Sequence, residues 1–344
     1  MRDGLAARVV GLALAMMTAF LPAQGFAQTA QPFYKGKQIT LLIASGAGGG
    51  YDTYARSLAR HMGRHIPGNP TIVPKNVPGA GGLIAANTLY NNTAPDGLTF
   101  AALTNGAAMD PLFGETAARF DGQKFNWLGS IGKLENICVT WKAKSPVTRI
   151  EQAREREITV SATGATGNSA IMPKIVNQFL GTKFKVIGGY AEGAGQTLAL
   201  ERGEVDGICG LSYSTLKASR PDWFRDNKLN IILQIGLEKL KDLPNVPSAI
   251  DLVSDPDSRK VLELILIRQE MGRPFAVTPG TPPDRVAILR QAFADTLKDP
   301  MFLAEAAKLQ LEIDPLTGPQ IAELLKTAYS APAAIVARAA QLAK

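Results

Sequence analysis

A run of apolar residues leads directly into a glycine cluster in the stretch Ile39-Thr-Leu-Leu-Ile-Ala-Ser-Gly-Ala-Gly-Gly-Gly-Tyr-Asp52. The apolar run predicts a buried β-strand, and the residues after the cluster predict a helix from about Thr53 to His65 with Asp52 as its N-cap. A second strand, glycine cluster and helix start follow in Ile158-Thr-Val-Ser-Ala-Thr-Gly-Ala-Thr-Gly-Asn-Ser169. Glycine lets a backbone approach a ligand closely, and the free N–H groups at a helix start favour an anion. Two such loops that face one another would clamp an anion.

The N-terminus has the pattern of a secretory signal peptide. Arg2 and Arg8 precede an apolar stretch over residues 9–21, and Gly25-Phe-Ala27 supplies small residues at the −3 and −1 positions of a cleavage site. That stretch is shorter than the roughly 20 residues that a membrane-spanning helix needs. We therefore expect residues 1–27 to be removed after export.

Length and composition favour two globular lobes. The 344 residues exceed the roughly 250–300 that one hydrophobic core usually serves, and 46% of them are hydrophobic. The net charge of +7 suits an anionic ligand, and it is equally compatible with a role in solubility alone. Since no run of five Lys or Arg residues occurs and aromatic residues make up only 7%, we expect no nucleic-acid partner.

Short apolar runs alternate with amphipathic segments from Ile39 onward, a pattern typical of an α/β fold. A second βαβαβ series starts near Ile137, and the last third of the chain is mainly helical, with its last two helices predicted at Gly318–Tyr329 and Ala333–Leu342. We expect these last helices to pack back on the first lobe. The predicted limits are residues 28–132 and 251–344 for the first lobe and residues 133–250 for the second, with strands that cross between them.

Motifs for catalysis and nucleotide binding do not fit this chain. Tyr51 stands where a dinucleotide fingerprint needs its third glycine, no Gly-Lys-Ser/Thr triplet occurs, and a serine-hydrolase pattern fails at Ser214. His61 and His65 have a zinc-compatible spacing, but Met62 replaces the glutamate of the metalloprotease motif. We predict solvent-exposed histidines, no catalytic residue, no metal site and no cofactor.

Two other features have more than one interpretation. Cys138 and Cys209 both lie in predicted strands, and they either form a disulfide or are two buried free thiols. Tyr190 and Ser212 follow predicted strands, at the carboxyl ends where ligands bind in open α/β sheets. For these two residues, ligand contact and a turn or packing role are both compatible with the sequence.

An ordered set of motifs gives the chain a family resemblance. The set comprises Ala47-Gly-Gly-Gly-Tyr-Asp52, Asn76-Val-Pro-Gly-Ala-Gly-Gly82, Ala94-Pro-Asp-Gly-Leu-Thr99, Gly203-Glu-Val-Asp-Gly207, Leu243-Pro-Asn-Val-Pro247 and Pro279-Gly-Thr-Pro-Pro283. Together they resemble the Bug-type periplasmic receptors of tripartite tricarboxylate transporters. The resemblance implies a type II periplasmic-binding-protein fold, with two α/β lobes joined by crossover strands and a ligand cleft between them. It also implies a periplasmic monomer that delivers a small carboxylate to two integral membrane subunits.

The resemblance also implies that backbone amides of the two glycine loops hold the ligand carboxylate. Carried over to this sequence, the ligand residues are Ser45, Ala47, Gly48, Gly49 and Asp52 in the first loop and Thr163, Gly164, Gly167, Asn168 and Ser169 in the second. Two departures alter the pocket wall. Ala44-Ser45-Gly46 stands where many relatives have proline and an aromatic residue, and Ile171-Met-Pro173 stands where many have a histidine.

These observations favour a receptor that binds a mono- or dicarboxylate. Because neither glycine loop contains Arg or Lys, we expect backbone dipoles rather than a salt bridge to hold the anion. An exported enzyme acting on organic acids or esters and a sensor that presents a ligand to a membrane protein remain the alternatives.

Overall fold

A computed structural model describes residues 32–164, 167–190 and 192–342 of the protein. The predicted signal peptide, residues 1–27, lies outside the described residues. From Phe33 onward the chain clusters as one compact unit that contains two β-sheets. Among the residues that the structure describes, none of the helices combines the length and the apolar character needed to cross a membrane.

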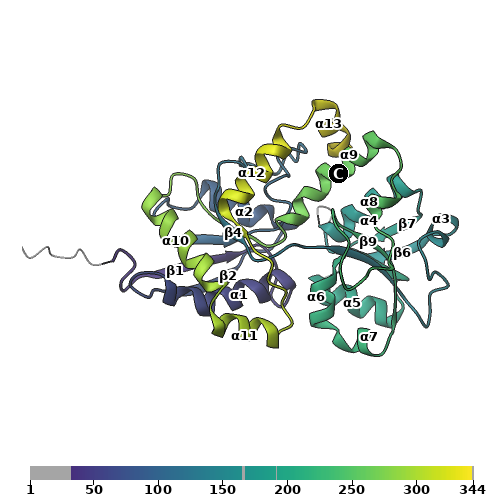
Figure 1. Ribbon diagram of the computed structural model, residues 1–344, viewed down its shortest axis with the longest axis horizontal. Coiled ribbons are helices and arrows are strands. Elements are labelled where there is room, and N and C mark those ends of the chain that lie inside the picture. Colours follow the sequence, from purple (N-terminus) through teal and green to yellow (C-terminus); the bar gives the residue numbers. More distant parts are fainter. Residues whose placement is uncertain (1–31, 165–166, 191, 343–344) are drawn as a thin grey trace, which may run out of the picture. The chain divides into compact units, whose positions relative to one another are not determined.

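The first sheet has six strands in the order β11-β4-β10-β3-β1-β2. Strand β1 pairs in parallel with β2 and β3, whereas β10 is antiparallel to both β3 and β4. Two of its strands, β10 and β11, therefore come from the last third of the chain. Figure 1 labels β1, β2 and β4 of this sheet. The strands are β1 (Gln38–Ile43), β2 (Thr71–Asn76), β3 (Thr99–Ala102), β4 (Asn126–Ser130), β10 (Pro274–Val277) and β11 (Leu316–Thr317).

Successive side chains of a strand point to opposite faces of a sheet, so apolar side chains on both faces need a covering layer. Helices cover both faces of this sheet. Leu41 and its alternate neighbours pack with helices α1, α10 and α11, whereas Leu42 packs in a different cluster with α2 and α12. We call this sheet and its helices the first lobe. The helices are α1 (Gly50–Met62), α2 (Leu83–Asn91), α10 (Pro283–Thr296), α11 (Pro300–Lys308) and α12 (Gly318–Tyr329), with short 3-10 helices at Gly63–His65 and Ala80–Gly82.

The second sheet has five strands in the order β7-β6-β8-β5-β9 and, with its helices, forms the second lobe. Its strands are β5 (Asn136–Trp141), β6 (Ile158–Ser161), β7 (Phe184–Ile187), β8 (Gly207–Ser212) and β9 (Leu229–Ile235). The helices are α3 (Gln152–Glu155), α4 (Asn168–Leu180), α5 (Glu192–Arg202), α6 (Tyr213–Ser219), α7 (Pro221–Arg225) and α8 (Ala249–Leu252).

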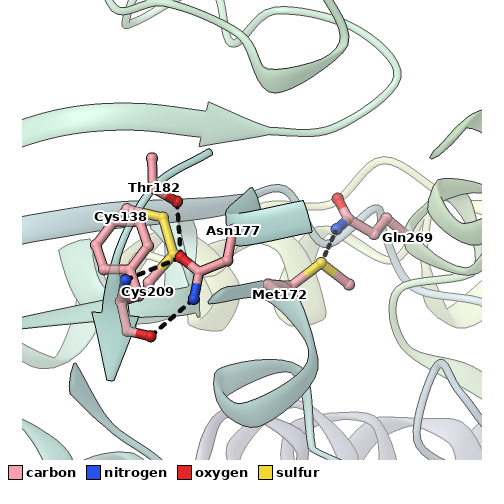
Figure 2. Close-up of a disulfide and its surroundings, with 7 residues drawn as sticks. Cys138, Met172, Asn177, Thr182, Cys209 and Gln269 are labelled. Carbon is pink, nitrogen blue, oxygen red and sulfur yellow. Dashed lines mark hydrogen bonds between the residues drawn. A yellow bond between two sulfur atoms is a disulfide. The ribbon is translucent and has the colours of Figure 1, made fainter. Parts of the chain in front are cut away.

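A disulfide joins two neighbouring strands of the second sheet. Cys138 of β5 is the direct partner of Cys209 of β8, and their sulfur atoms are 1.95 Å apart. Figure 2 shows this bridge near Asn177 of α4, whose side-chain amide bonds Thr182 and Phe184. Of the two interpretations that the sequence left open, the structure has the disulfide.

Two adjacent segments connect the lobes. Residues 131–135 lead from β4 to β5, and residues 271–273 lead from α9 (Pro256–Glu270) to β10. Ile131 N–H of the first segment donates to the Arg273 carbonyl of the second (3.2 Å), and Leu134 N–H donates to the carbonyl of Gln269 near the end of α9 (2.9 Å). Gly272 permits this approach, because a Cβ atom there would lie 2.5 Å from the Leu134 nitrogen. The predicted two-lobed α/β fold with crossing segments is thus confirmed.

The C-terminal third of the chain contacts both lobes. Strands β10 and β11 lie in the first sheet, whereas α9 and α13 (Ala333–Leu342) pack on each other and on helices of the second lobe, α8 and α4. The sequence limits of the lobes, residues 28–132 with 251–344 and residues 133–250, stay a prediction.

Candidate functional site

A cleft of about 480 Å³ lies between the two lobes, and both glycine loops line it. Nine of the twelve residues predicted to contact a ligand line this cleft. They are Ser45, Gly49, Thr163, Gly164, Gly167, Asn168, Ser169, Tyr190 and Ser212. The structure therefore brings together residues that are up to 167 positions apart in the sequence (212 minus 45). Ala47, Gly48 and Asp52 do not line the cleft; whether the nine residues bind a ligand stays a prediction.

The first loop connects β1 to α1 and exposes the start of that helix to the cleft. Helix α1 begins at Gly50, and its N-cap residue is Gly49. No side-chain hydrogen bond caps the start of this helix. The first N–H groups of a helix lack partners within the helix, and its dipole favours negative charge there. Since Gly49, Gly50 and Tyr51 line the cleft, this helix start can serve an anion bound in it.

Asp52 holds the first loop in shape from behind. Its carboxylate accepts hydrogen bonds from the N–H of Gly48 (2.9 Å), Nε of Arg56 (2.8 Å) and Nδ2 of Asn76 (2.8 Å). Burial alone would raise its pKa, but the bonds from Gly48, Asn76 and Arg56 outweigh burial and lower the pKa. The predicted N-cap role was wrong: the glycines let the helix begin at Gly50, so Asp52 is the third helical residue and bonds back to the loop.

The second loop has the same construction. It connects β6 to α4, where Gly167 precedes the helix and no side chain caps it. The Ser169 hydroxyl accepts a hydrogen bond from Thr163 N–H (3.3 Å), and Tyr190 N–H donates to the Ala162 carbonyl (3.2 Å). Gly164 lines the cleft, and a Cβ atom there would meet nothing within 4 Å. The second loop thus presents another uncapped helix start beside open space.

Polar side chains meet across the cleft. Asn105, which follows β3 of the first lobe, accepts bonds from the Tyr51 hydroxyl (3.3 Å) and from Nδ2 of Asn168 in the second lobe (3.5 Å). Nδ2 of Asn105 and Oδ1 of Asn168 are buried without a hydrogen-bond partner. Burial raises the pKa of Tyr51, so its hydroxyl stays protonated at neutral pH. The cleft therefore offers both donors and acceptors to a polar ligand.

Two arginines that no sequence motif indicated also line the cleft, Arg273 from a crossing segment and Arg268 from the helix before it. Arg273, 2% exposed, donates from Nη1 to the Lys133 carbonyl (2.8 Å) and from Nη2 to the hydroxyls of Ser214 (3.1 Å) and Thr215 (3.2 Å). Its guanidinium also stacks on the ring of Tyr54, 3.9 Å from the centroid. Arg273 thereby ties the crossing segment to both lobes.

Arg268, the second of these arginines, is also 2% exposed and lines the cleft from α9. The cleft lining thus contains two guanidinium groups besides the helix starts. That backbone dipoles rather than a salt bridge hold the anion stays a prediction. The sequence carries one signal for Arg268, because this arginine ends the mainly apolar run Val261-Leu-Glu-Leu-Ile-Leu-Ile-Arg268. A charge beside so many buried residues is unusual unless it has a specific role.

The prediction of solvent-exposed histidines was wrong for His61. Helix α11 packs beside α1, and Nε2 of His61, only 7% exposed, bonds Glu305 at 2.8 Å. His65 is partly exposed and bonds Asp299 at 2.9 Å. Both histidines therefore help to attach α11 to α1. Among the described residues there is no group of three or more His, Cys, Asp or Glu side chains arranged to hold a metal ion.

Comparison with known proteins places this geometry in a family. The model of the tripartite tricarboxylate transporter family receptor matches residues 54–338. A UPF0065 protein from the gbd 5' region of Cupriavidus necator is 27% identical over 323 residues, covering 90% of this chain and 88% of that protein. The fold is similar to that of the periplasmic binding protein BugD, with a TM-score of 0.69, 20% identity, and 90% and 97% of the two chains covered. It is equally similar to an R. palustris protein solved with adipate, with a TM-score of 0.69, 19% identity, and 89% and 98% covered.

Two α/β lobes with a polar cleft between them give this chain the fold of a periplasmic binding protein. Because the family model covers most of the chain, this protein belongs to the tripartite tricarboxylate transporter receptor family. That family comprises solute-binding receptors and is not a family of enzymes. The family resemblance found in the sequence is confirmed.

Proposed function

We propose that this protein is a periplasmic receptor that captures a mono- or dicarboxylate in the cleft and delivers it to the two membrane subunits of a transporter. One observation carries the proposal. Two glycine loops, one from each lobe, present uncapped helix starts to a single cleft of about 480 Å³. A carboxylate that reaches both loops exchanges its water for N–H donors that are already in place.

The two loops contribute differently to this capture. Gly49, Gly164 and Gly167 line the cleft, and at Gly164 the space beside the backbone is open. Gly48 and Asp52 instead keep the first loop in the conformation that the helix start needs. Ordered water can bridge the remaining distance at little cost in affinity. The relative solved with adipate supports a carboxylate as the ligand class.

Neither the family nor the cleft favours catalysis. The described residues that line the cleft include the serines Ser45, Ser169 and Ser212, but no histidine or carboxylate that would activate a serine as its general base. We propose that the protein binds its ligand without converting it, and that it acts as a monomer, without a cofactor, toward its membrane partners.

Calorimetric titration tests this function. The mature protein, residues 28–344, is unfolded and refolded to remove bound ligand and then titrated with aliphatic and aromatic mono-, di- and tricarboxylates. We expect one-to-one binding with micromolar or tighter affinity, and nuclear magnetic resonance should show the acid unchanged after incubation. No binding of any acid, or consumption of one, would contradict the proposal.

A further inference from the structure

Arg268 lies at the cleft yet belongs to neither glycine loop. It is close to the C-terminal end of α9, its side chain is 3% exposed, and it lines the cleft together with Arg273. Gly106 of the first lobe leaves the space that its guanidinium occupies, because a Cβ atom at position 106 would lie only 2.0 Å from Nη2. The fold thus holds this guanidinium closely at the cleft.

The guanidinium of Arg268 is poorly satisfied. Its two nitrogens Nε and Nη1 are buried without a hydrogen-bond partner. The nearest carboxylate oxygen, Oδ1 of Asp110, lies 3.9 Å from Nη2, beyond hydrogen-bonding distance. A guanidinium carries five N–H donors, and leaving such donors buried and unpaired is unfavourable. Arg273 differs, since protein oxygens accept from both of its Nη atoms.

Asp110 is a weak counter-ion for this charge. Burial raises its pKa, although Arg268 acts in the opposite direction. Because Oδ1 of Asp110 lies 3.9 Å from Nη2, the two atoms are too far apart for a hydrogen bond, and Asp110 does not engage this donor of the guanidinium. The pair therefore leaves a buried positive charge with free donors, and that is the chemistry that recognises an anion.

We propose that Arg268 forms a second anion subsite of the cleft and that the ligand carries two anionic groups, as a dicarboxylate does. This inference rests on the proposed function, in which the two glycine loops hold the first carboxylate. The second carboxylate of the ligand lies in the cleft and contacts the guanidinium where Arg268 lines it. Asn105, whose Nδ2 is also buried and unpaired, precedes Gly106 and supplies a further donor near this position.

Matched pairs of acids test the subsite in the wild-type protein. Each pair has the same carbon skeleton with one or two carboxylates: butyrate and succinate, pentanoate and glutarate, hexanoate and adipate, and 4-methylbenzoate and terephthalate. We expect the best-bound dicarboxylate to bind at least about tenfold more tightly than its monocarboxylate partner, the gain of one charged hydrogen-bonded contact. Equal affinity within every pair would overturn the subsite and leave the carboxylate receptor intact. If no acid binds, the proposed function fails together with the subsite.

Three variants assign the effect to Arg268. R268Q should weaken dicarboxylate binding about ten- to hundredfold and change monocarboxylate binding by less than about threefold, because it removes only the charge at the second subsite. R268K keeps the positive charge but lacks the planar, paired donors of a guanidinium, so it should retain part of the preference for dicarboxylates over monocarboxylates. D110N leaves Arg268 in place, removes its weak counter-ion and should tighten dicarboxylate binding severalfold.

A matched control separates recognition from folding. Arg338 of α13 bonds the Ser258 hydroxyl and does not line the cleft, so R338Q should leave both affinities unchanged. If R268Q weakens mono- and dicarboxylates to the same extent, Arg268 has a structural role and the inference is wrong. Weaker dicarboxylate binding by D110N would also contradict the inference. Because D110N keeps Arg268, it tests the second anion subsite even if R268Q does not fold.

Discussion

Reduction of the Cys138–Cys209 disulfide should lower the free energy of unfolding by about 4 kcal/mol. The two cysteines are 71 positions apart, and closing a loop of that length removes about 15 cal/mol/K of entropy from the unfolded chain, or about 4 kcal/mol at 25 °C. Urea unfolding of the mature protein with and without a phosphine reductant measures the difference. The urea midpoint should fall, because the bridge constrains the unfolded state more than it supports the folded one.

The control is the double variant C138A/C209A, which should have a lowered midpoint that the reductant no longer affects. Both cysteines are buried in the core cluster and neither lines the cleft, so carboxylate affinity at 25 °C should not change on reduction. An unchanged urea midpoint on full reduction, verified by thiol titration of the unfolded protein, would refute the entropic argument. Two thiols that react in the unreduced, unfolded chain would refute the disulfide itself.

Three further predictions concern the cleft and the attachment of α11. Gly164→Leu should fill the cleft and weaken carboxylate binding at least about a hundredfold in calorimetry. The matched control is Gly188→Leu, at an exposed glycine outside the cleft lining where an added Cβ atom also meets nothing within 4 Å, and this variant should bind as wild type. The pKa of Glu305 is lowered to about 2, first by Arg60 and then by His61, so its stabilisation is complete above its usual pKa of 4.5 and is lost as the pH falls toward 2. Glu305→Gln should therefore lower unfolding free energy by about 1–2 kcal/mol at pH 7 but not at pH 2 in urea titrations; an equal loss at both values would contradict the assignment. Raising the salt concentration from 50 to 500 mM should weaken binding less than about threefold, since salt screens buried charges little, and a steep decline in titrations would place the anion at the surface.

Local sequence signals predicted the elements that form the loops and the last two helices. The helices Gly318–Tyr329 and Ala333–Leu342 match the structure at both ends. Thr317 explains why the first of these helices begins at Gly318, because its side chain and that of Gln320 form a capping box around the helix start. Each strand, glycine loop and helix start is likewise contained in about a dozen neighbouring residues, so its pattern is visible without the fold.

The base of the cleft could not be predicted in the same way. Strand β10 has only four residues, and antiparallel pairing with β3 and β4, more than 140 positions earlier in the chain, determines its place (274 minus 130). Arg273 precedes that strand and Arg268 lies near the end of the helix before it, so the positions of both arginines depend on this distant pairing. The burial of His61 similarly depends on α11, more than 200 positions later. Periodicity describes one element at a time and carries no information about such contacts.

The two arginines of the cleft differ in what their donors are free to do. Each glycine loop belongs to one lobe, so a carboxylate bound by both loops connects the lobes at the cleft mouth. Arg273 connects them at the crossing segment, through Tyr54 on one side and Ser214 and Thr215 on the other. Its donors are already engaged by the protein, so its charge supports the fold. Arg268 is the guanidinium with unengaged donors, and for this reason the identity of the far end of the ligand should depend on Arg268 and not on Arg273.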